Sequence, residues 1–409
     1  MKKYSLSKDQ IKILLLEGIH ESALKLFHDS GYRNVETYST ALDYNELTEK
    51  IKDVHMIGIR SRTELSSQIL EHANKLIAIG CFSIGTNQVD KKAAKSRGIP
   101  VFNAPFSNTR SVAELVIAES IMLMRSVPRL NTYAHSGKWY KSAKNCYEVR
   151  GKTIGIIGYG HIGSQVSILA EAFGMKVIYF DILKKLSIGN AIQCRTLQDV
   201  LKNADIVTLH VPSTRETKEM IASDEIALMK KGAILINASR GDVVEYSALA
   251  EALKSGHLTG AAVDVFPVEP ASNADPFKFV LQGMENVILT PHIGGSTLEA
   301  QENIGTEVAE KMVQYSDIGS TLGSVNFPQI SLAPNKNLQR FLHIHKNQPG
   351  VMQEVNRVFS GKGINIASVY LQTDPDIGYV IVDTESHLDE NITKELKVIN
   401  HTIKSRMLY

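Results

Sequence analysis

Three short loops in the second half of the chain carry an arginine, a glutamate and a histidine, the residue types that proton transfer beside a bound anion would use. Arg240 lies in NASRGD, Glu269 in DVFPVEP and His292 in TPHIGG, each just after an apolar run. An imidazole changes charge near neutral pH, and a neighbouring carboxylate favours its protonated form. A guanidinium matches a carboxylate with two parallel hydrogen bonds. Each residue alone is most often a solvated surface group, so the prediction of catalysis depends on the three together.

A glycine-rich segment, GYGHIG, follows one apolar run and opens a helical pattern. Gly158 allows a tight turn, Gly160 lets the backbone approach a pyrophosphate, and Gly163 allows the helix to pack closely on the strand. Asp181 ends the next apolar run, where its carboxylate would bind ribose hydroxyls and repel a 2′-phosphate. A glycine turn without a ligand and a turn aspartate are the alternatives. Together, however, the strand, glycines, helix and acidic residue predict a site for NAD rather than NADP.

Short apolar runs alternate with helical patterns over most of the chain, which is typical of parallel sheets covered by helices. One series occupies residues 11–102, and a second occupies residues 153–290. The sequence therefore predicts an α/β protein with two doubly wound parallel-sheet domains. Ligands of such sheets bind outside the carboxyl ends of the strands, where the glycine segment and the three loops would lie.

The C-terminal part of the chain changes character. Residues 316–337 are rich in glycine, serine, proline and asparagine, and we interpret them as a linker. From residue 338 the pattern becomes strand, helix, strand, strand, helix, strand, which is the order of a ferredoxin-like βαββαβ domain.

The composition limits the classes of protein to consider. The chain has 409 residues and a formal net charge of +2, so no polyanionic partner such as nucleic acid is expected. Its three cysteines, Cys81, Cys146 and Cys194, are sparse and fit a reducing cytoplasm, and no Cys/His cluster has the spacing of a metal site. No apolar run approaches the roughly 20 residues of a membrane span. We therefore expect a cytoplasmic protein that binds no metal and no membrane.

The motifs GYGHIG, NASRG, AAVDVFPVEP and NVILTPHIGG resemble those of the D-isomer-specific 2-hydroxyacid dehydrogenase family. The resemblance extends over roughly the first 330 residues. It implies a Rossmann NAD-binding domain at 108–295, inserted into a discontinuous flavodoxin-like substrate-binding domain made of 1–107 and 296–330.

The resemblance also implies the roles of individual residues. The family's catalytic arginine, glutamate and histidine match Arg240, Glu269 and His292. Besides the three glycines and Asp181, the residues implied to contact NAD are His161, Ile162, Ala238, Ser239, Arg240, Asp264, His292, Gly294 and Gly295.

Two arginines at the end of an early apolar run indicate the charge of the substrate. Arg60, Ser61 and Arg62 lie in GIRSRT, and two guanidinium groups suit a phosphate. The resemblance implies that Arg60 contacts the substrate. For Arg62, an ion pair with Glu64 or Asp53 is an equal alternative. Further candidate substrate contacts are Asn108 and Lys141.

The motifs HIHKNQPGV and GINIAS in the C-terminal part resemble an ACT domain, a module that binds amino acids at a paired interface. The resemblance covers residues 338–409 and matches His345, Asn347 and Asn365 with the polar contacts of a serine-binding version. An amide binds the carboxylate and ammonium of an amino acid together, because it offers an acceptor and donors. Turn capping by the two asparagines is the alternative.

These resemblances imply one function and leave others open. The expected reaction is NAD-dependent oxidation of 3-phospho-D-glycerate to 3-phosphohydroxypyruvate, the first step of L-serine biosynthesis, in a homotetramer inhibited by L-serine. In the reverse direction we expect reduction of 2-oxoglutarate to 2-hydroxyglutarate. The alternatives are a hydroxypyruvate or glyoxylate reductase, and an NAD(H)-sensing binding protein without turnover.

Overall fold

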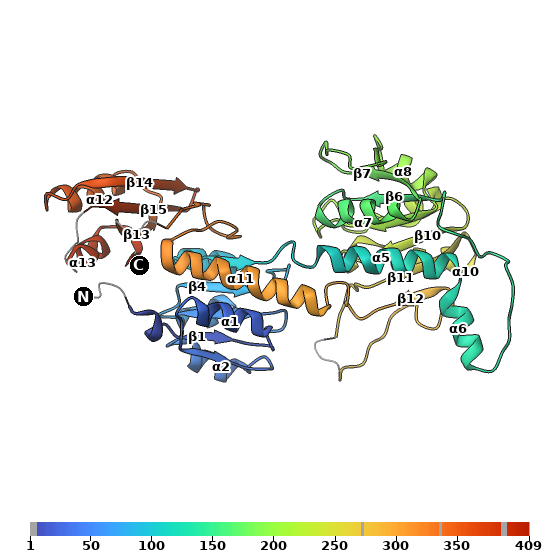
Figure 1. The fold of residues 1–409 in the computed structure, drawn as a ribbon, viewed down its shortest axis with the longest axis horizontal. Helices are drawn as coiled ribbons and strands as arrows, with labels where there is room; N and C mark the ends of the chain where they lie inside the picture. The colour runs from blue at the N-terminus through green and yellow to red at the C-terminus, as the bar shows by residue number, and fades with distance from the viewer. Residues whose placement is uncertain (1–5, 271–273, 335–337, 386–390, 409) are drawn as a thin grey trace. The chain divides into compact units, whose positions relative to one another are not determined.

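The computed structural model describes residues 6–270, 274–334, 338–385 and 391–408. Within the segment predicted to be regulatory, residues 386–390 and 409 lie outside the described residues. The chain forms two compact units. Unit 1 contains the chain up to Ser107 and again from Gln301 onward, and unit 2 contains Asn108–Ala300. Unit 2 is thus inserted in the sequence of unit 1 (Figure 1).

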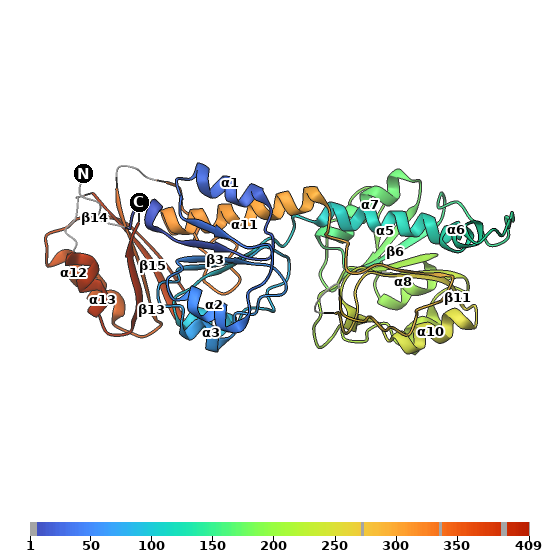
Figure 2. The same cartoon turned by 90° about the horizontal axis from the view of Figure 1, so that it is seen from below.

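Unit 1 contains a five-stranded, all-parallel sheet in the order β2-β1-β3-β4-β5, which we call the N-terminal lobe together with its helices. Its strands are β1 (Ile13–Leu15), β2 (Val35–Thr37), β3 (Met56–Ile59), β4 (Ala78–Cys81) and β5 (Val101–Asn103). Its helices are η1 (Lys8–Gln10), α1 (Glu21–Asp29), α2 (Tyr44–Ile51), α3 (Ser67–Glu71), α4 (Lys91–Ser96) and α11 (Leu298–Ile318). Figure 2 shows α1 and α11 on one face of this sheet and α2 and α3 on the other.

Helix α11, which comes late in the sequence, completes the core of the N-terminal lobe. Val308 and Met312 of α11 are fully buried against Ile13 and Phe27 from the start of the chain. Burying a large aliphatic or aromatic side chain contributes about 1.5–3 kcal/mol. The same apolar cluster continues into the C-terminal sheet through Tyr379, so the two sheets of unit 1 share one core.

The C-terminal sheet of unit 1 is antiparallel and has the order β14-β15-β13-β16. Its elements are β13 (Gln339–Lys346), α12 (Val351–Ser360), β14 (Ile366–Thr373), β15 (Ile377–Thr384), α13 (Asn391–Val398) and β16 (Thr402–Met407). This βαββαβ order confirms the prediction for this segment. The bidentate ion pair of Arg340 with Asp383 is almost fully buried, and Arg340 Nη1 also donates to the carbonyl of Ile318 at the end of α11 (3.1 Å).

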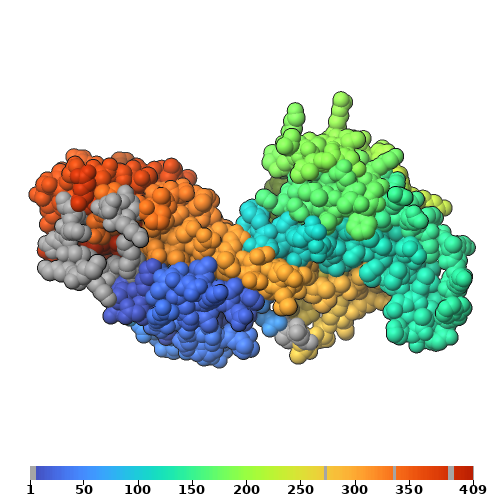
Figure 3. Space-filling model, in the orientation of Figure 1, coloured from blue at the N-terminus to red at the C-terminus, as the bar shows by residue number. Residues whose placement is uncertain are grey.

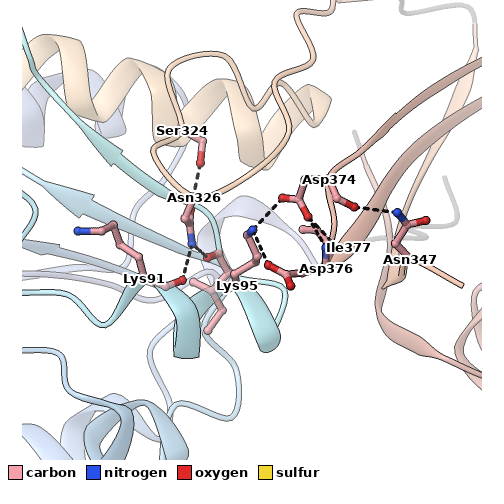
Figure 4. Close-up of polar contacts among 9 residues, drawn as sticks. Lys91, Lys95, Ser324, Asn326, Asn347, Asp374, Asp376 and Ile377 are labelled. Atoms are coloured by element: carbon pink, nitrogen blue, oxygen red, sulfur yellow. Dashed lines mark hydrogen bonds and ion pairs between the residues drawn. The ribbon is translucent and has the colours of Figure 1, made fainter.

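The segment predicted as a linker is largely packed on the N-terminal lobe. Asn326 is 8% exposed; its Oδ1 accepts the Val101 N–H (2.8 Å), and its Nδ2 donates to the Ile99 carbonyl (3.0 Å) and more weakly to that of Lys91 (Figure 4). Polar composition suggested a free connection, but here the polar side chain pairs with the backbone of β5. Residues 335–337 of the predicted linker lie outside the described residues.

Unit 2 is a seven-stranded, all-parallel sheet in the order β12-β11-β10-β9-β6-β7-β8. Its strands are β6 (Thr153–Ile157), β7 (Lys176–Phe180), β8 (Ile192–Gln193), β9 (Ile206–Leu209), β10 (Ala233–Asn237), β11 (Leu258–Val263) and β12 (Val287–Leu289). Its helices are α5 (Thr109–Met124), α6 (Val127–His135), α7 (His161–Ala172), α8 (Leu197–Asn203), α9 (Ser223–Leu228), η2 (Gly241–Val243) and α10 (Tyr246–Lys254). In Figure 2, α5 and α7 cover one face of the sheet and α8 and α10 the other.

The strand order of unit 2 fixes where its loops meet. Strands β10, β11 and β12 are neighbours and parallel, so the loops that follow them leave the same edge of the sheet. The order reverses at β6, which has β9 on one side and β7 on the other. Such a reversal opens a crevice at the carboxyl edge, and the glycine segment follows β6 there.

Among the described residues, no helix is both long and apolar enough to cross a membrane. No group of three or more histidine, cysteine, aspartate or glutamate side chains in the described part of the chain could hold a metal ion.

Candidate active site

The turn between β6 and α7 requires glycine for local steric reasons. Gly158 has a φ of +91°, and a Cβ there would collide with the carbonyl of His210. A Cβ at Gly163 would collide with the carbonyl of Gly158. Gly160 differs, because no atom of a described residue lies within 4 Å of the place where its Cβ would be. The space over Gly160 is therefore open at the N-terminus of a twelve-residue helix, a position that favours a phosphate.

Asp181 follows β7 and is fixed beside this turn. Its Oδ2 accepts the Tyr159 N–H and its Oδ1 accepts the Leu183 N–H, each at 2.9 Å. These two amides hold the carboxylate while leaving it partly exposed. A carboxylate at this strand end binds ribose hydroxyls and disfavours a 2′-phosphate, as expected for NAD.

His292 and Glu269, which follow β12 and β11, form a hydrogen-bonded pair. The imidazole Nδ1 lies 2.8 Å from Glu269 Oε2 and 3.0 Å from Oε1, while Oε1 also accepts the Phe266 N–H (3.2 Å). The side chains are 53% and 37% exposed. Because Nδ1 faces the carboxylate, Nε2 remains for a reacting group.

The pair shifts the pKa of both partners. The hydrogen bond from His292 to Glu269 raises the pKa of His292 above its ordinary value of 6.5, more than burial lowers it. Burial alone would raise the pKa of Glu269, but His292, the Phe266 N–H and the charge of Arg240 together lower it. Arg240 also lowers the pKa of His292 slightly, so its charge acts on the pair. The carboxylate therefore stabilises an imidazolium, as a proton-accepting histidine needs.

Asp264, at the end of β11, holds the loop that carries His292. It is 2% exposed; its Oδ1 accepts from the Ile293 N–H (2.8 Å) and the Thr290 hydroxyl (2.7 Å), and its Oδ2 accepts the Gly294 N–H (2.8 Å). These bonds support the φ of +54° at His292, which non-glycine residues rarely adopt. Asp264 thus orients the histidine; a contact with NAD stays a prediction.

Arg240 is held by a network that the sequence did not reveal. Asn237, which is 1% exposed, donates from Nδ2 to the Arg240 carbonyl and the Tyr246 hydroxyl (both 2.9 Å), and its Oδ1 accepts the Ser239 N–H (3.1 Å). Arg240 Nη1 donates to the Ser239 carbonyl (2.6 Å). The only sequence signal was the presence of Asn237 in NASRG.

Several of the residues predicted to contact NAD lie at the glycine turn or directly after a strand of unit 2. His161 and Ile162 begin α7 at the glycine turn, and Ala238 and Ser239 directly follow β10. Gly295 packs so closely on Asn108 that a Cβ would collide with the Asn108 amide. Asn108 is 8% exposed, and its Oδ1 has no hydrogen-bond partner within the described ranges of the chain.

Lys141 and the tryptophan lie in the irregular segment after α6, which forms part of the surface drawn in Figure 3. Trp139 is 90% exposed, and Lys141 is also exposed. Lys141 forms no ion pair with any described residue, and its role in substrate binding stays a prediction.

The predicted phosphate-binding loop lies in unit 1, at the carboxyl end of β3. Arg60 is partly exposed, and Ser61 and Arg62 are exposed. Of the two alternative partners of Arg62, Asp53 pairs with Lys75 (2.5 Å). Among the described residues Arg62 forms no side-chain ion pair, so its charge is available to an anion.

The three residues predicted to bind serine are not together within one chain. His345 is 2% exposed on β13, opposite Gly378. Asn347 follows β13, and its Nδ2 donates to the Asp374 carbonyl (2.8 Å). Asn365 precedes β14 at the other end of the sheet, which the strand register sets about 25–30 Å away along the strands.

Comparison with known proteins identifies the family. Two family models match the chain. The model of the NAD-binding domain of D-isomer specific 2-hydroxyacid dehydrogenases matches residues 117–294, and the model of the AHAS small subunit-like ACT domain matches residues 341–404. The chain is 58% identical over 407 residues to D-3-phosphoglycerate dehydrogenase of Haemophilus influenzae, covering 100% of this chain and 99% of the relative. The chain belongs to the D-3-phosphoglycerate dehydrogenase family.

A second relative, the D-3-phosphoglycerate dehydrogenase of Escherichia coli K12, is 56% identical over the full length of both chains. A solved D-lactate dehydrogenase from Aquifex aeolicus, complexed with NAD and lactic acid, matches 78% of this chain and 100% of its own, with 27% identity and a TM-score of 0.67. As a member of the D-3-phosphoglycerate dehydrogenase family, the chain is an NAD-dependent oxidoreductase with an ACT domain.

Proposed function

We propose that the chain oxidises 3-phospho-D-glycerate to 3-phosphohydroxypyruvate, the first step of L-serine biosynthesis. The observation that carries the proposal is the His292–Glu269 pair, at the strand edge that also carries the glycine turn. Oxidation of a 2-hydroxy acid requires a base for the hydroxyl proton, a cation for the carboxylate and a hydride acceptor.

The residues of unit 2 fit a bound NAD. The open turn at Gly160 and the N-terminus of α7 would hold its pyrophosphate, and Asp181 its adenosine ribose. NAD, when bound, accepts the hydride that leaves the substrate's C2. His292 Nε2 takes the hydroxyl proton, and Glu269 holds the ring through Nδ1 and stabilises the imidazolium that forms.

The substrate carries two anionic groups, and the chain provides cations for both. Arg240 would bind the carboxylate with its planar fork. Arg60 would bind the phosphate, with Arg62 as a second cation. In the reverse direction protonated His292 returns its proton to a carbonyl, so we also propose reduction of 2-oxo acids such as 2-oxoglutarate.

A comparison of two substrates tests the proposal. NADH formation is measured with 3-phospho-D-glycerate and with D-glycerate, which lacks only the phosphate. We expect a kcat/KM at least a hundredfold higher for the phosphorylated acid, because charge-assisted hydrogen bonds contribute about 1.5–3 kcal/mol each. Equal values would favour a hydroxypyruvate or glyoxylate reductase, and no NADH with either acid would favour a sensor.

We further propose that L-serine inhibits the enzyme and that the protein is a homo-oligomer, with a homotetramer as the expected form. Since Asn365 and Asn347 lie at opposite ends of one sheet, a single serine bound by both requires two copies of the C-terminal domain. His345 supports such a site, because its buried Nδ1 has no hydrogen-bond partner in the part of the chain that the structure describes. Sedimentation with and without serine measures the assembly. We also propose a cytoplasmic location, in keeping with three free cysteines.

A chain of contacts gives serine a route to the N-terminal lobe. Asn347 donates to the Asp374 carbonyl, and the Asp374 carboxylate pairs with Lys95 of α4 (2.8 Å). Lys95 also pairs with Asp376 (Figure 4). The carbonyl of Asp376 in turn accepts the Asn347 N–H (3.0 Å). Serine that engages Asn347 would compete with the Asp374 contact, and the contact of this loop with α4 would change.

A further inference from the structure

A buried carboxylate lies beneath the loop that carries the two substrate arginines. Glu17, two residues after β1, is 8% exposed. Its Oε1 accepts the backbone N–H groups of Arg60 (3.0 Å) and Thr63 (2.9 Å), and its Oε2 accepts that of Arg62 (2.9 Å). Three amides of one loop thus converge on a single side chain, as they would on a bound anion.

The backbone of Glu17 is itself held in an unusual conformation. Its φ is +64°, in the left-handed region that glutamate rarely adopts. The Glu17 N–H donates to the Thr40 carbonyl (3.1 Å), and the next residue, Gly18, donates to the Tyr38 carbonyl (2.9 Å). Such strain persists where the surroundings fix the conformation, and it clusters at functional sites.

Glu17 binds the loop through its backbone amides and does not neutralise the guanidinium groups of its two arginines. Arg60 Nη1 donates to the backbone carbonyl of Glu17 (3.4 Å), and among the described residues no ion pair joins the Glu17 carboxylate to either guanidinium. On the other side of the loop, Gln88 Nε2 donates to the Arg60 carbonyl (2.5 Å). The loop is therefore clamped through its backbone, and both guanidinium groups stay available.

We propose that Glu17 is a positioning residue for phosphate recognition: its carboxylate occupies the amides of the Arg60–Thr63 loop and so aims Arg60 and Arg62 at the phosphate of the substrate. The inference rests on the proposed function. It also has a chemical consequence, because amides filled by Glu17 cannot bind phosphate. Discrimination for the phosphate is thereby left to the arginine side chains.

The test is Glu17→Gln, with Glu64→Gln as the matched control. Glutamine keeps one acceptor but presents an NH₂ to the remaining loop amide. We expect the KM for 3-phospho-D-glycerate to rise about tenfold or more, because one charged hydrogen bond is lost and a donor is left unpaired. The kcat should change by less than about threefold, and the KM for NAD should not change. Exposed Glu64 has the same charge beside the loop without these bonds, and its loss should leave KM unchanged or lower.

The possible outcomes distinguish a positioning role of Glu17 from an effect of its negative charge and from damage to the fold. Loss of a negative charge alone would lower the KM for the anion, and general damage to the fold would reduce kcat/KM for D-glycerate equally; either result overturns the inference. If Glu17→Gln does not fold, Gln88→Met decides, with a severalfold rise in the same KM expected and no change contradicting it. A wild type inactive on 3-phospho-D-glycerate overturns the proposed function as well, whereas an active wild type with an unaffected variant overturns only the inference.

Discussion

Two regions with proposed roles each contain a histidine, in opposite surroundings. We call the sheet edge of unit 2 that carries Glu269 and His292 the catalytic edge, and the end of the C-terminal sheet that carries His345 and Asn347 the effector end. His292 is half exposed, has a carboxylate partner and has a raised pKa. His345 is 2% exposed, its Nδ1 has no hydrogen-bond partner among the described residues, and burial lowers its pKa. The first is suited to exchange a proton at neutral pH, and the second to offer hydrogen bonds while it stays neutral. The difference shows that the hydrogen-bond partner and the burial of a histidine, rather than its residue type alone, set its pKa and so the role it is suited to.

Removal of the imidazole at the catalytic edge should have the largest effect. His292→Ala should lower kcat by about 10²–10⁴, the usual contribution of a general base, while NADH binding persists. The matched variant at the effector end, Asn347→Ala, should keep kcat and lose inhibition by serine. Steady-state kinetics and fluorescence titration with NADH measure both. Full turnover in His292→Ala would remove the distinction between the two regions.

Removal of the carboxylate partner, Glu269, should lower the pKa of His292 and so make it more similar to that of His345. In the proposed mechanism oxidation needs neutral His292, so we expect activity to rise as the pH passes through the pKa of His292. Because Glu269 raises that pKa, Glu269→Gln should move the acid limb of the kcat/KM profile to lower pH. The plateau rate should fall about tenfold or more, as the imidazolium loses its stabilisation. A profile that keeps its midpoint would contradict the pairing.

The effector end should respond little to pH. Burial lowers the pKa of His345, so the serine concentration that halves activity should be nearly constant at neutral pH and above. The oxidation rate, by contrast, should follow the titration of His292, whose pKa is raised by Glu269. Serine titrations at several pH values measure this. An inhibition constant that follows a titration in this range would show that His345 takes up a proton.

Among the substitutions, the smallest effect should come from the ion pairs that join Lys95 of α4 to Asp374 and Asp376, in the loop between β14 and β15. Lys95 is 20% exposed and pairs with two aspartates, one of them largely exposed, and such pairs contribute about 0–1 kcal/mol. Lys95→Met should therefore shift half-inhibition by serine by no more than about fivefold, and less at high salt. Lys92→Met, on the exposed side of α4, should cause no shift. Equal shifts in both variants would exclude the proposed route.

Much of the catalytic edge could be predicted from the sequence, because its signals are local. The Gly158–Gly163 turn and Asp181 lie at fixed distances from strand ends, and a parallel sheet brings strand-end loops such as that of His292 to one edge. The pairing of His292 with Glu269 follows from neighbouring strands, once the order β10-β11-β12 is known.

The remaining features depend on register and on long-range pairing. The strand pattern did not show that Asn347 and Asn365 lie at opposite ends of their sheet, since that follows from the hydrogen-bond register. Glu17 lies 43 positions before the first loop amide that it binds, and no local motif marks it. Asn326 was hidden by a composition typical of linkers, although its side chain pairs with β5.

A ribosome makes the five-stranded sheet of unit 1 well before the helix that covers it. Residues 108–300 must be synthesised in between, which takes roughly 10–40 s at about 5–20 residues per second. During that interval α1 can cover part of this face, but the part that later receives Val308 and Met312 of α11 stays exposed. Unit 2 can fold as it emerges from the ribosome, whereas the sheet of unit 1 cannot complete its core until α11 has been synthesised. Chaperone binding to the nascent chain should therefore be strongest at that face.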